Sequence, residues 1–304
     1  MLGLDFGGSK IAAAVASMDG RWIGDAVVAT DPSLGARPNL ARGIEAARDL
    51  LAELAPGEAP AAVGAATFGI PGAHGIGLAP AIDGWERIAL ARELSEAFDC
   101  SRVRVATDVK AGAAAEARLG ALAGHDPALY VNLGTGLAVA LVVGGEVVLG
   151  ANGAAGEIGY SLLSVEDVGL RTRDVLEDRA SGMGLAAASG TPAAVVFERS
   201  SDDARLATLV DELVRHLCFH VVNLAIALDP SRIAVGGGMV RSWGRIEGPL
   251  LQALDAAVPY PPELVVGAFP FDAALVGAVS LAVEAADGSW AGIASAPAIG
   301  STSK

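Results

Sequence analysis

The stretch that decides the fold reads LGLDFGGSKIAAAVASMDGRWIG over residues 2–24, and residues 129–150, LYVNLGTGLAVALVVGGEVVLG, repeat its pattern. Each stretch contains an apolar strand that ends in a polar residue, a glycine-rich turn, a second apolar strand, another turn with glycine and a third strand. Repetition of one such unit along a chain indicates duplication. We therefore expect two similar domains that face each other.

Between and after these stretches, helix patterns and strand patterns alternate. We predict helices at residues 39–55, 88–98, 108 to about 122, 203–228 and 273–286, and strands at residues 61–68, 103–106 and 233–235. A loop is expected at residues 151–165, with mostly helix after it. Such alternation is typical of α/β proteins.

The order of these elements suggests where the domains begin and end. Residues 1–107 are predicted to form a small N-terminal α/β domain, and residues 108–272 a larger C-terminal α/β domain. The last helix, at about residues 273–286, is predicted to pack back onto the first domain. Residues 287–304 are rich in Gly, Ala, Ser and Pro, so we expect a disordered tail there.

The composition limits the partners and the compartment. The chain has 304 residues and a formal net charge of −14, and no cluster of Lys and Arg interrupts that charge. We therefore expect no binding to nucleic acid and no docking on anionic membranes. The 19 residues from Pro127 to Gly145 lack charge, but the glycines at their centre favour two strands over a transmembrane helix. Two cysteines, Cys100 and Cys218, and no visible export signal lead us to expect a cytoplasmic protein.

The glycine-rich turn after the first strand, Asp5-Phe6-Gly7-Gly8-Ser9-Lys10, has the features of a phosphate-binding loop. Glycines let backbone N–H groups approach an anion, a hydroxyl can add a donor, and an acid at the strand end can hold Mg²⁺ through water. A plain hairpin turn is the ordinary alternative, and it would be preferred for this turn alone. The second turn, Gly134-Thr135-Gly136, favours paired phosphate loops. The sequence contains neither a P-loop nor a Rossmann fingerprint.

Asp108 is the candidate general base. It follows a predicted strand in Ala106-Thr107-Asp108-Val109-Lys110, and a carboxylate at a strand end could accept the proton of an attacking hydroxyl. Thr107 or Asp108 could instead cap the helix that follows. The two roles are compatible, so capping does not exclude catalysis.

Two further acids and two histidines have candidate roles. Glu157 lies in a glycine-rich loop, where a carboxylate could accept two sugar hydroxyls, and Glu177 is similar. Their ordinary alternatives are a solvated loop acid and a charge on a helix surface. His216 and His220 have the four-residue spacing of metal ligands on a helix, but no acid completes a site. We therefore interpret the two histidines as part of the helix flank.

Taken in order, these motifs resemble the ROK family of sugar kinases and repressors, within the actin-like/hexokinase ATPase superfamily. The resemblance runs from about Leu2 to Glu284. It comprises the first phosphate motif D-x-G-G-T-K, a G-x-P-G loop, an A-P-N-L-x-W stretch, N-D-A-N, the second phosphate motif, G-x-x-G-E-x-G-H and the adenosine-side glycines. Here these are residues 4–10, 69–72, 79–85, 107–110, 133–136, 153–159 and 236–238. The resemblance implies a two-domain actin-like (ribonuclease H-like) α/β fold with a cleft between the domains, and an ATP-dependent sugar kinase.

The resemblance also assigns roles to single residues. Asp108 would be the catalytic base, and Asp5 the acid near Mg²⁺. The implied sugar-binding residues are Gly72, Thr107, Asp108, Glu157, Tyr160 and Glu177. The implied nucleotide-binding residues are Asp5, Gly7, Gly8, Ser9, Lys10, Gly134, Thr135, Gly136, Gly236, Gly237 and Gly238. ATP and Mg²⁺ are the implied cofactors and a small sugar the implied partner. A homodimer is one implied state, because members of the family are often dimers or tetramers.

Three departures from the family's pattern bear on the substrate. The family's zinc site uses the His of E-x-G-H and a cysteine cluster, but here that His is Tyr160 and residues 161–175 contain no cysteine, so we expect no zinc. The family's Asn before the catalytic Asp is Thr107, whose hydroxyl has a different reach from an amide. Tyr160 is also larger than His and cannot be a cation. We therefore expect a changed sugar, a hexose or a modified hexose such as the amino sugar kanosamine, phosphorylated at its 6-hydroxyl.

Other functions fit parts of the pattern. A transcriptional repressor of the same family would need a DNA-binding domain before the first phosphate motif, but Asp5 is already the fifth residue. A non-catalytic sugar-binding sensor fits the departures at Thr107 and Tyr160, whereas the retained Asp108 weighs against it. Another actin-like ATPase, such as an acetate-type kinase or a chaperone-like ATPase, is disfavoured by length and by the G-E-x-G loop. Polyphosphate as the phosphoryl donor also stays open.

Overall fold

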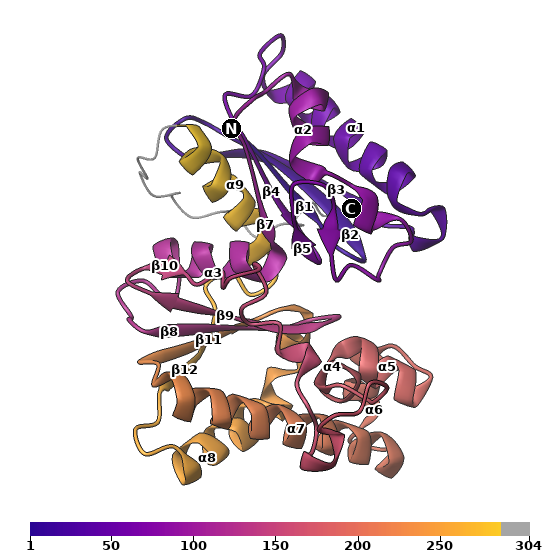
Figure 1. Ribbon diagram of the computed structural model, residues 1–304, viewed down its shortest axis with the longest axis vertical. Coiled ribbons are helices and arrows are strands. Elements are labelled where there is room, and N and C mark those ends of the chain that lie inside the picture. Colours follow the sequence, from indigo (N-terminus) through magenta and orange to yellow (C-terminus); the bar gives the residue numbers. More distant parts are fainter. Residues whose placement is uncertain (287–304) are drawn as a thin grey trace. The chain divides into compact units, whose positions relative to one another are not determined.

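A computed structural model describes residues 1–286, which divide into two units, each with its own sheet and hydrophobic core (Figure 1). Of the described residues, the first unit contains Met1–Leu119, Ala151–Gly153 and residues 272–286, and the second contains Gly120–Gly150 and Ala154–Phe271. Helix α3 (Asp108–Leu119) is thus grouped with the first unit, beyond the boundary at residue 107 that the sequence suggested. The tail expected at residues 287–304 lies outside the described residues.

The first unit is built on a five-stranded sheet in the order β3-β2-β1-β4-β7. Its strands are β1 (Leu2–Phe6), β2 (Lys10–Ala16), β3 (Trp22–Ala29), β4 (Val63–Thr67) and β7 (Val103–Thr107). Strands β1, β2 and β3 pair antiparallel, whereas β1, β4 and β7 pair parallel. Every residue of β1 and of β4 is buried, as expected for strands that are covered on both faces.

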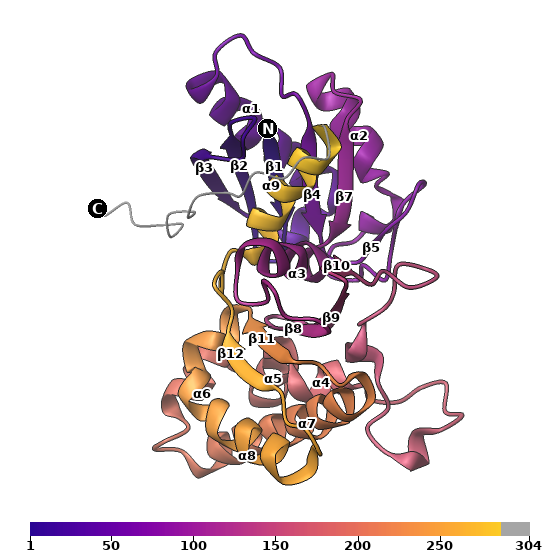
Figure 2. The same ribbon diagram turned by 90° about the vertical axis from the view of Figure 1, so that its left-hand side faces the viewer.

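Helices cover both faces of this first sheet (Figures 1 and 2). Helix α1 (Ala36–Leu54) packs on β2 and β3, and α2 (Leu90–Phe98) packs on β4 and β7. Helix α9 (Ala273–Ala286) packs on the opposite face, against β1, β4 and α3. A Cβ atom at Gly64 would lie 1.9 Å from the carbonyl oxygen of Ala278. Glycine at this point of β4 therefore allows the backbone of α9 to lie directly on the sheet.

The second unit repeats this topology in its own sheet, whose order is β10-β9-β8-β11-β12. Its strands are β8 (Ala128–Leu133), β9 (Leu137–Val143), β10 (Glu146–Val147), β11 (Arg232–Gly236) and β12 (Glu263–Val266). Strands β8, β9 and β10 pair antiparallel, and β8, β11 and β12 pair parallel. The two sheets thus have the same strand order and directions, which confirms the duplication predicted from residues 2–24 and 129–150.

The longest helix of the second unit supplies much of its core. Buried side chains recur every three or four residues along α7, which is the pattern of an amphipathic helix. The α-helices of this unit are α4 (Leu176–Ala180), α5 (Gly182–Ser189), α6 (Ala193–Arg199), α7 (Ala204–Leu228) and α8 (Glu247–Ala257).

The chain also has a two-stranded ribbon of β5 (Ile70–Pro71) and β6 (Ile76–Gly77). Its 3₁₀ helices are η1 (Pro32–Leu34), η2 (Trp85–Arg87), η3 (Ile158–Tyr160), η4 (Val165–Asp167) and η5 (Gly238–Arg245).

The predicted helices and strands all occur, with ends shifted by a few residues, but several elements were missed. Helix α8, strand β12 and the short strands β5 and β6 had not been predicted. The prediction of mostly helix after residue 165 is wrong for residues 168–175. Gly169 there has a φ of 87°, in the left-handed region, and this conformation interrupts a right-handed helix.

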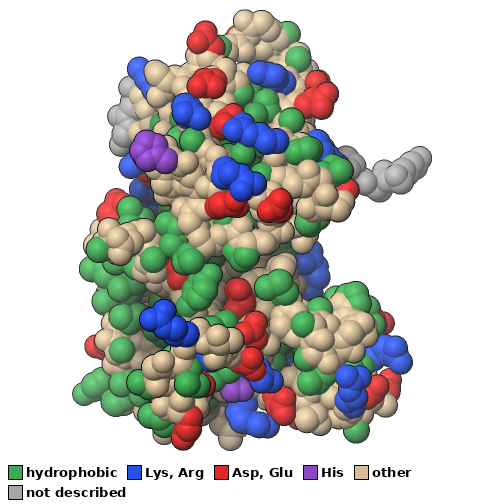
Figure 3. All heavy atoms as spheres, turned by 45° about the vertical axis from the view of Figure 1, so that its right-hand side comes forward, with side chains coloured by type: hydrophobic (Ala, Val, Ile, Leu, Met, Phe, Trp, Pro, Cys, Tyr) green, Lys and Arg blue, Asp and Glu red, His purple; other side chains and the backbone are tan. Residues whose placement is uncertain are grey.

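No helix among residues 1–286 combines the length and the apolar character that a membrane crossing requires. The uncharged run from Pro127 to Gly145 forms β8 and β9, as predicted. On the face shown in Figure 3, acidic side chains (red) and basic side chains (blue) are interspersed with hydrophobic ones.

Candidate active site

Hydrogen bonds to backbone groups fix the turn between β1 and β2, and one of its glycines has free space around it. The Gly7 N–H donates to the Lys10 carbonyl oxygen at 2.9 Å, and the Thr30 hydroxyl donates to the Gly7 carbonyl oxygen at 2.8 Å. Around Gly8, by contrast, no heavy atom lies within 4 Å of the place where a Cβ atom would be. The turn is therefore fixed in shape and can be approached closely at Gly8, as a phosphate-binding loop requires.

Asp5, at the end of β1, is a buried carboxylate in a cluster of charged groups. It is 9% exposed, and its Oδ1 atom has no hydrogen-bond partner among the described residues. Burial raises the pKa of Asp5 from 3.8 to about 7, and the neighbouring Asp108 adds to the shift. Lys10 opposes the shift, and Asp272 adds to it. An unpartnered buried carboxylate oxygen beside other acids fits a nearby divalent cation.

Asp272 is a member of this cluster that the sequence analysis missed. The Lys10 Nζ atom lies 3.3 Å from Asp272 Oδ1. Asp272 immediately precedes α9, and its carbonyl oxygen accepts the Val276 N–H at 3.0 Å. The ion pair therefore joins β2 of the first unit to the start of the C-terminal segment that returns to this unit. Since 262 residues separate the partners, no local pattern in the sequence could have shown this pair.

The structure shows which of Thr107 and Asp108 caps helix α3. The Thr107 hydroxyl oxygen accepts the Lys110 N–H at 3.1 Å and so caps the first turn of α3. Thr107 is 3% exposed, which leaves its hydroxyl little access to a ligand. The Asp108 Oδ1 atom accepts the Val109 N–H at 2.9 Å, and its carboxylate is among the charges near Asp5. Asp108 is therefore the candidate base at the end of β7, and Thr107 is the residue that caps α3.

Gly72, the remaining sugar-binding candidate of the first unit, lies in the turn of the β5–β6 ribbon. Its N–H donates to the Gly75 carbonyl oxygen at 2.8 Å, and the residue is exposed. The ribbon packs beside β7, the strand that leads to Asp108. The first unit thus brings together Asp5, Lys10, Asp108 and Asp272, with Gly72 on a neighbouring element.

The turn between β8 and β9 is held by backbone bonds from the start of α5. The Gly134 N–H donates to the Gly136 carbonyl oxygen at 3.1 Å. The Gly182 N–H donates to the Gly134 carbonyl oxygen at 3.0 Å, and the Met183 N–H donates to the Thr135 carbonyl oxygen at 2.9 Å. Thr135 remains exposed at the tip of the turn. No side chain of this turn carries a charge, so any anion there would be bound by backbone N–H groups and the Thr135 hydroxyl.

The acids of the second unit lie together with Tyr160. Burial raises the pKa of the Tyr160 phenol, and Glu177 and then Glu157 raise it further. The Tyr160 side chain is 47% exposed. Glu177 Oε1 accepts the Leu137 N–H at 3.0 Å, so it touches the second turn as well. The second unit therefore brings the predicted sugar-binding residues Glu157, Tyr160 and Glu177 next to the predicted phosphate residues.

The glycines after β11 have structural reasons to be glycine. A Cβ atom at Gly236 would lie 2.2 Å from the Tyr130 hydroxyl oxygen. Gly237 has a φ of 96°, and a Cβ atom there would lie 2.4 Å from the Leu133 carbonyl oxygen. Gly238 begins η5, and among the described residues the only atom within 4 Å of a Cβ placed there is the Arg241 Nη1 atom, at 3.9 Å. This segment therefore lies against the β8–β9 turn, and Gly238 is its accessible member.

Comparison with known proteins agrees with this combination of two duplicated sheets and two glycine turns. The model of the ROK family matches residues 1–285. This chain belongs to the ROK family.

Many of the ROK relatives are named as sugar kinases, and one of the similar ROK structures is named as a transcriptional regulator. A glucokinase of Halalkalibacterium halodurans is 29% identical over 197 residues, which are 57% of this chain and 59% of the relative, less than two thirds of its length. An N-acetylmannosamine kinase of Escherichia coli is 29% identical over 302 residues, which are 92% of this chain and 97% of the relative. The crystal structure of a ROK glucokinase from Streptomyces griseus in complex with glucose and AMPPNP is 27% identical, with a TM-score of 0.76 over 93% of this chain and 98% of that one. The fold is therefore the actin-like ATPase fold of ROK sugar kinases.

The loop between Tyr160 and α4 is the place where the ROK pattern has its cysteines. Here hydrogen bonds hold this loop. Asp167 Oδ2 accepts the N–H groups of Leu163 and Ser164 at 3.1 and 2.9 Å. Among residues 1–286, no group of three or more His, Cys, Asp or Glu side chains is arranged to hold a metal ion. On α7, burial lowers the pKa values of His216 and His220, as it does for histidines on a helix flank.

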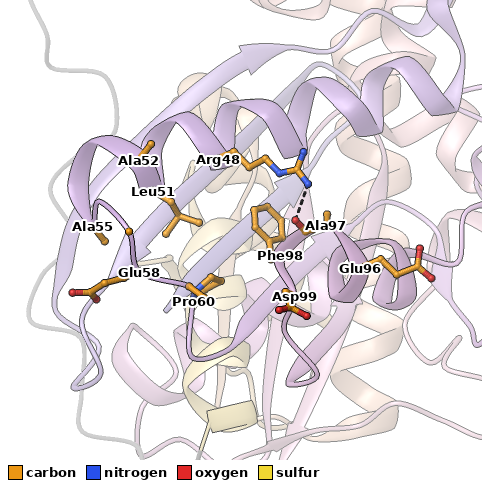
Figure 4. Close-up of a pocket in the computed structure, with 12 residues that line it drawn as sticks. Arg48, Leu51, Ala52, Ala55, Glu58, Pro60, Glu96, Ala97, Phe98 and Asp99 are labelled. Atoms are coloured by element: carbon orange, nitrogen blue, oxygen red, sulfur yellow. Dashed lines mark hydrogen bonds between the residues drawn. The ribbon is translucent and has the colours of Figure 1, made fainter.

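A groove on the first unit contains none of the candidate residues (Figure 4). It has a volume of about 400 Å³ and lies between the C-terminal ends of α1 and α2. Arg48 crosses it and donates to the Ala97 carbonyl oxygen at 2.7 Å. Neither Asp5 nor Asp108 lines this groove, so it takes no part in the candidate active site.

Proposed function

We propose that this ROK protein is an ATP-dependent kinase that phosphorylates a hexose or a modified hexose. The observation that carries the proposal is the placement of Asp108 at the end of β7, with its carboxylate close to Asp5 of the glycine-rich turn. A base and an acid suited to a metal are thereby next to an accessible phosphate-binding loop. The names of the relatives, glucokinase and N-acetylmannosamine kinase, support the same reaction class.

In the proposed reaction, Asp108 accepts the proton of the sugar's 6-hydroxyl as that oxygen attacks the γ-phosphorus of ATP. Transfer of a phosphoryl group needs little more from a protein than positioning, a base and neutralisation of charge. Backbone N–H groups at Gly8 and Gly134 and the hydroxyls of Ser9 and Thr135 would bind the phosphates. Mg²⁺, held through water by Asp5, would neutralise phosphate charge when bound.

The nucleotide would take its other contacts from residues that the ROK resemblance names. Gly7 and Lys10 belong to the first turn, and Gly136 to the second. Gly236, Gly237 and Gly238 would lie on the adenosine side. Of these last three, Gly238 has the space for a ligand, while Gly236 and Gly237 shape the backbone around it.

The sugar would be bound by Gly72 and Asp108 of the first unit and by Glu157, Tyr160 and Glu177 of the second. Thr107 is buried, and its oxygen already accepts the Lys110 N–H, so one lone pair and the O–H donor remain. It offers a sugar less than the Asn of the ROK pattern would. Together with Tyr160 this supports a changed sugar, and we propose an amino hexose such as kanosamine, whose ammonium group could pair with Glu157 or Glu177.

A coupled assay of ADP release with MgATP tests the proposal. The panel contains glucose, mannose, N-acetylmannosamine, glucosamine and kanosamine. In a parallel series polyphosphate replaces ATP, and the sugar phosphate is measured instead because this donor releases no ADP. We expect release that depends on one class of sugar, with amino sugars preferred. A clear preference for unmodified glucose would remove the amino-sugar part, whereas measurable sugar binding without release from any sugar would indicate a sensor.

A further inference from the structure

The segment that carries Glu177 also holds the β8–β9 turn in place. Three hydrogen bonds join residues 177–183 to that turn. The Leu137 N–H donates to the Glu177 carboxylate at 3.0 Å, the Gly182 N–H to Gly134 at 3.0 Å, and the Met183 N–H to Thr135 at 2.9 Å. Two of these bonds use backbone groups at both ends. The bond to Leu137 depends on a side chain, so it is the one that a substitution or a ligand can change.

Two glycines make room for the Glu177 carboxylate in this position. A Cβ atom at Gly136 would lie 2.6 Å from Glu177 Oε1. A Cβ atom at Gly159, in the loop of Glu157 and Tyr160, would lie 3.3 Å from the same oxygen. The carboxylate therefore fits between the phosphate turn and the sugar-binding loop, in contact with both.

The two oxygens of this carboxylate have different surroundings. Oε1 accepts the Leu137 N–H, whereas Oε2 makes no hydrogen bond within residues 1–286. A charged acceptor forms a stronger bond to a backbone N–H than a neutral one does. Oε1 thus fixes the start of β9, and Oε2 can accept a hydroxyl or an ammonium group of a sugar.

We propose that Glu177 is a positioning residue for the nucleotide as well as a sugar ligand, and that it couples the two binding events. This inference rests on the proposed function, because it takes the β8–β9 turn as a phosphate loop. A sugar that binds Oε2 fixes the Glu177 side chain, and Oε1 then fixes the turn more firmly. Nucleotide binding to the turn in its ordered form costs less entropy, so each ligand raises the affinity for the other.

Titration calorimetry with Mg·AMPPNP in the absence of any sugar tests this directly. For Glu177→Ala we expect the Kd for AMPPNP to rise about tenfold, because the Leu137 N–H loses its acceptor. Glu177→Asp keeps the charge, but its shorter side chain does not reach the Leu137 N–H, so a similar rise in Kd is expected. This variant replaces Glu177→Ala if that protein does not fold. For Glu177→Gln the amide oxygen can still accept the N–H, but a neutral acceptor bonds more weakly, so the Kd should rise only about two- to threefold.

Asp178→Ala is the matched control. Asp178 is the next acid on the same short helix, and its Oδ2 accepts the Val175 N–H instead of bonding the turn. Its loss should change the melting temperature but leave the Kd for AMPPNP within about twofold. An equal rise in Kd in Asp178→Ala and Glu177→Ala would show general loosening of α4 and overturn the proposal.

The outcomes separate this inference from the proposed function. If wild type binds AMPPNP and Glu177→Ala binds it equally well, Glu177 positions nothing for the nucleotide, while the kinase proposal stands. If wild type does not bind AMPPNP at all, the proposed function fails and this inference fails with it. A Glu177→Gln variant that is as weak as Glu177→Ala would also contradict the assigned hydrogen bond.

Discussion

The two glycine turns occupy equivalent places in duplicated sheets, yet they are built differently. The β1–β2 turn is braced by its own hairpin and Thr30, and it lies beside a cluster of charged side chains. The β8–β9 turn carries no charge and is braced from outside by Glu177 and the start of α5. The same scaffold thus occurs twice. The first turn has the proposed acid–base groups beside it, and the second is linked to the proposed sugar-binding acids.

The largest expected effect is on kcat, and it comes from a substitution beside the first turn. Asp108→Asn removes the proposed base but keeps a side chain of the same size, so kcat should fall by about 10²–10⁴-fold with KM for the sugar changed much less. Steady-state ADP release measures this. Activity close to wild type would refute the role of Asp108. The corresponding change in the second unit, Glu157→Gln, should mainly raise KM for the sugar.

Asp5 gives the first unit a pH dependence of stability. Its pKa is raised from 3.8 to about 7, so between these pH values the folded protein holds a proton that the unfolded chain has released. The free energy of unfolding should therefore fall as pH rises from about 4 to about 7, by an amount on the order of 4 kcal/mol.

Asp5→Asn tests this with urea unfolding of the metal-free protein at pH 5 and pH 8. The amide does not titrate, so the variant should lose Asp5's part of the pH dependence and be more stable than wild type at pH 8. Its activity should nevertheless be lost, because the acid near the proposed Mg²⁺ is gone. If the free energy of unfolding of Asp5→Asn differs between pH 5 and pH 8 as much as that of wild type, the assignment to Asp5 is contradicted.

A pair of glycine substitutions compares the two turns directly. Gly8 has open space around it, so Gly8→Ala should lower the affinity for AMPPNP several-fold and leave sugar binding unchanged. At Gly136, the new methyl group would meet Glu177 Oε1, so Gly136→Ala should weaken the binding of both nucleotide and sugar. Calorimetry with each ligand alone distinguishes the two. Equal behaviour of the variants would mean that the turns are not specialised as described.

The smallest expected effect concerns the ion pair of Lys10 and Asp272. Such a partly exposed ion pair contributes about 0–1 kcal/mol to holding Lys10 in place. Because Lys10 is a proposed nucleotide-binding residue, Asp272→Asn should raise KM for ATP by about two- to fivefold with kcat little changed. In a Lys10→Met background the same substitution should have no further effect on KM. Glu284→Gln is the matched control, because Glu284 pairs with Arg104 and Arg118 near the other end of α9. Additive effects of Lys10→Met and Asp272→Asn would show that Asp272 does not act through Lys10.

The sequence predicted the duplicated sheets and the two turns because their signals are local. Glycine turns, apolar strands and alternating helices can be recognised within windows of about ten to twenty residues. The contacts that complete the candidate site are not local. Asp272 meets Lys10 across 262 residues, and Glu177 reaches Leu137 across 40. Nor could the sequence decide whether Thr107 or Asp108 caps α3, since both residue types cap helices and the answer depends on burial.

The identity of the reaction is tested most directly by ³¹P–¹H correlated NMR of the mixture after incubation with MgATP and the sugar panel. We predict a new phosphomonoester resonance that is correlated with the protons on carbon 6 of one sugar class, together with ADP. The same spectrum from Asp108→Asn should show almost none of it. Inorganic phosphate as the only new species, or no change from ATP with any sugar, would contradict the assignment of this ROK protein as a sugar kinase.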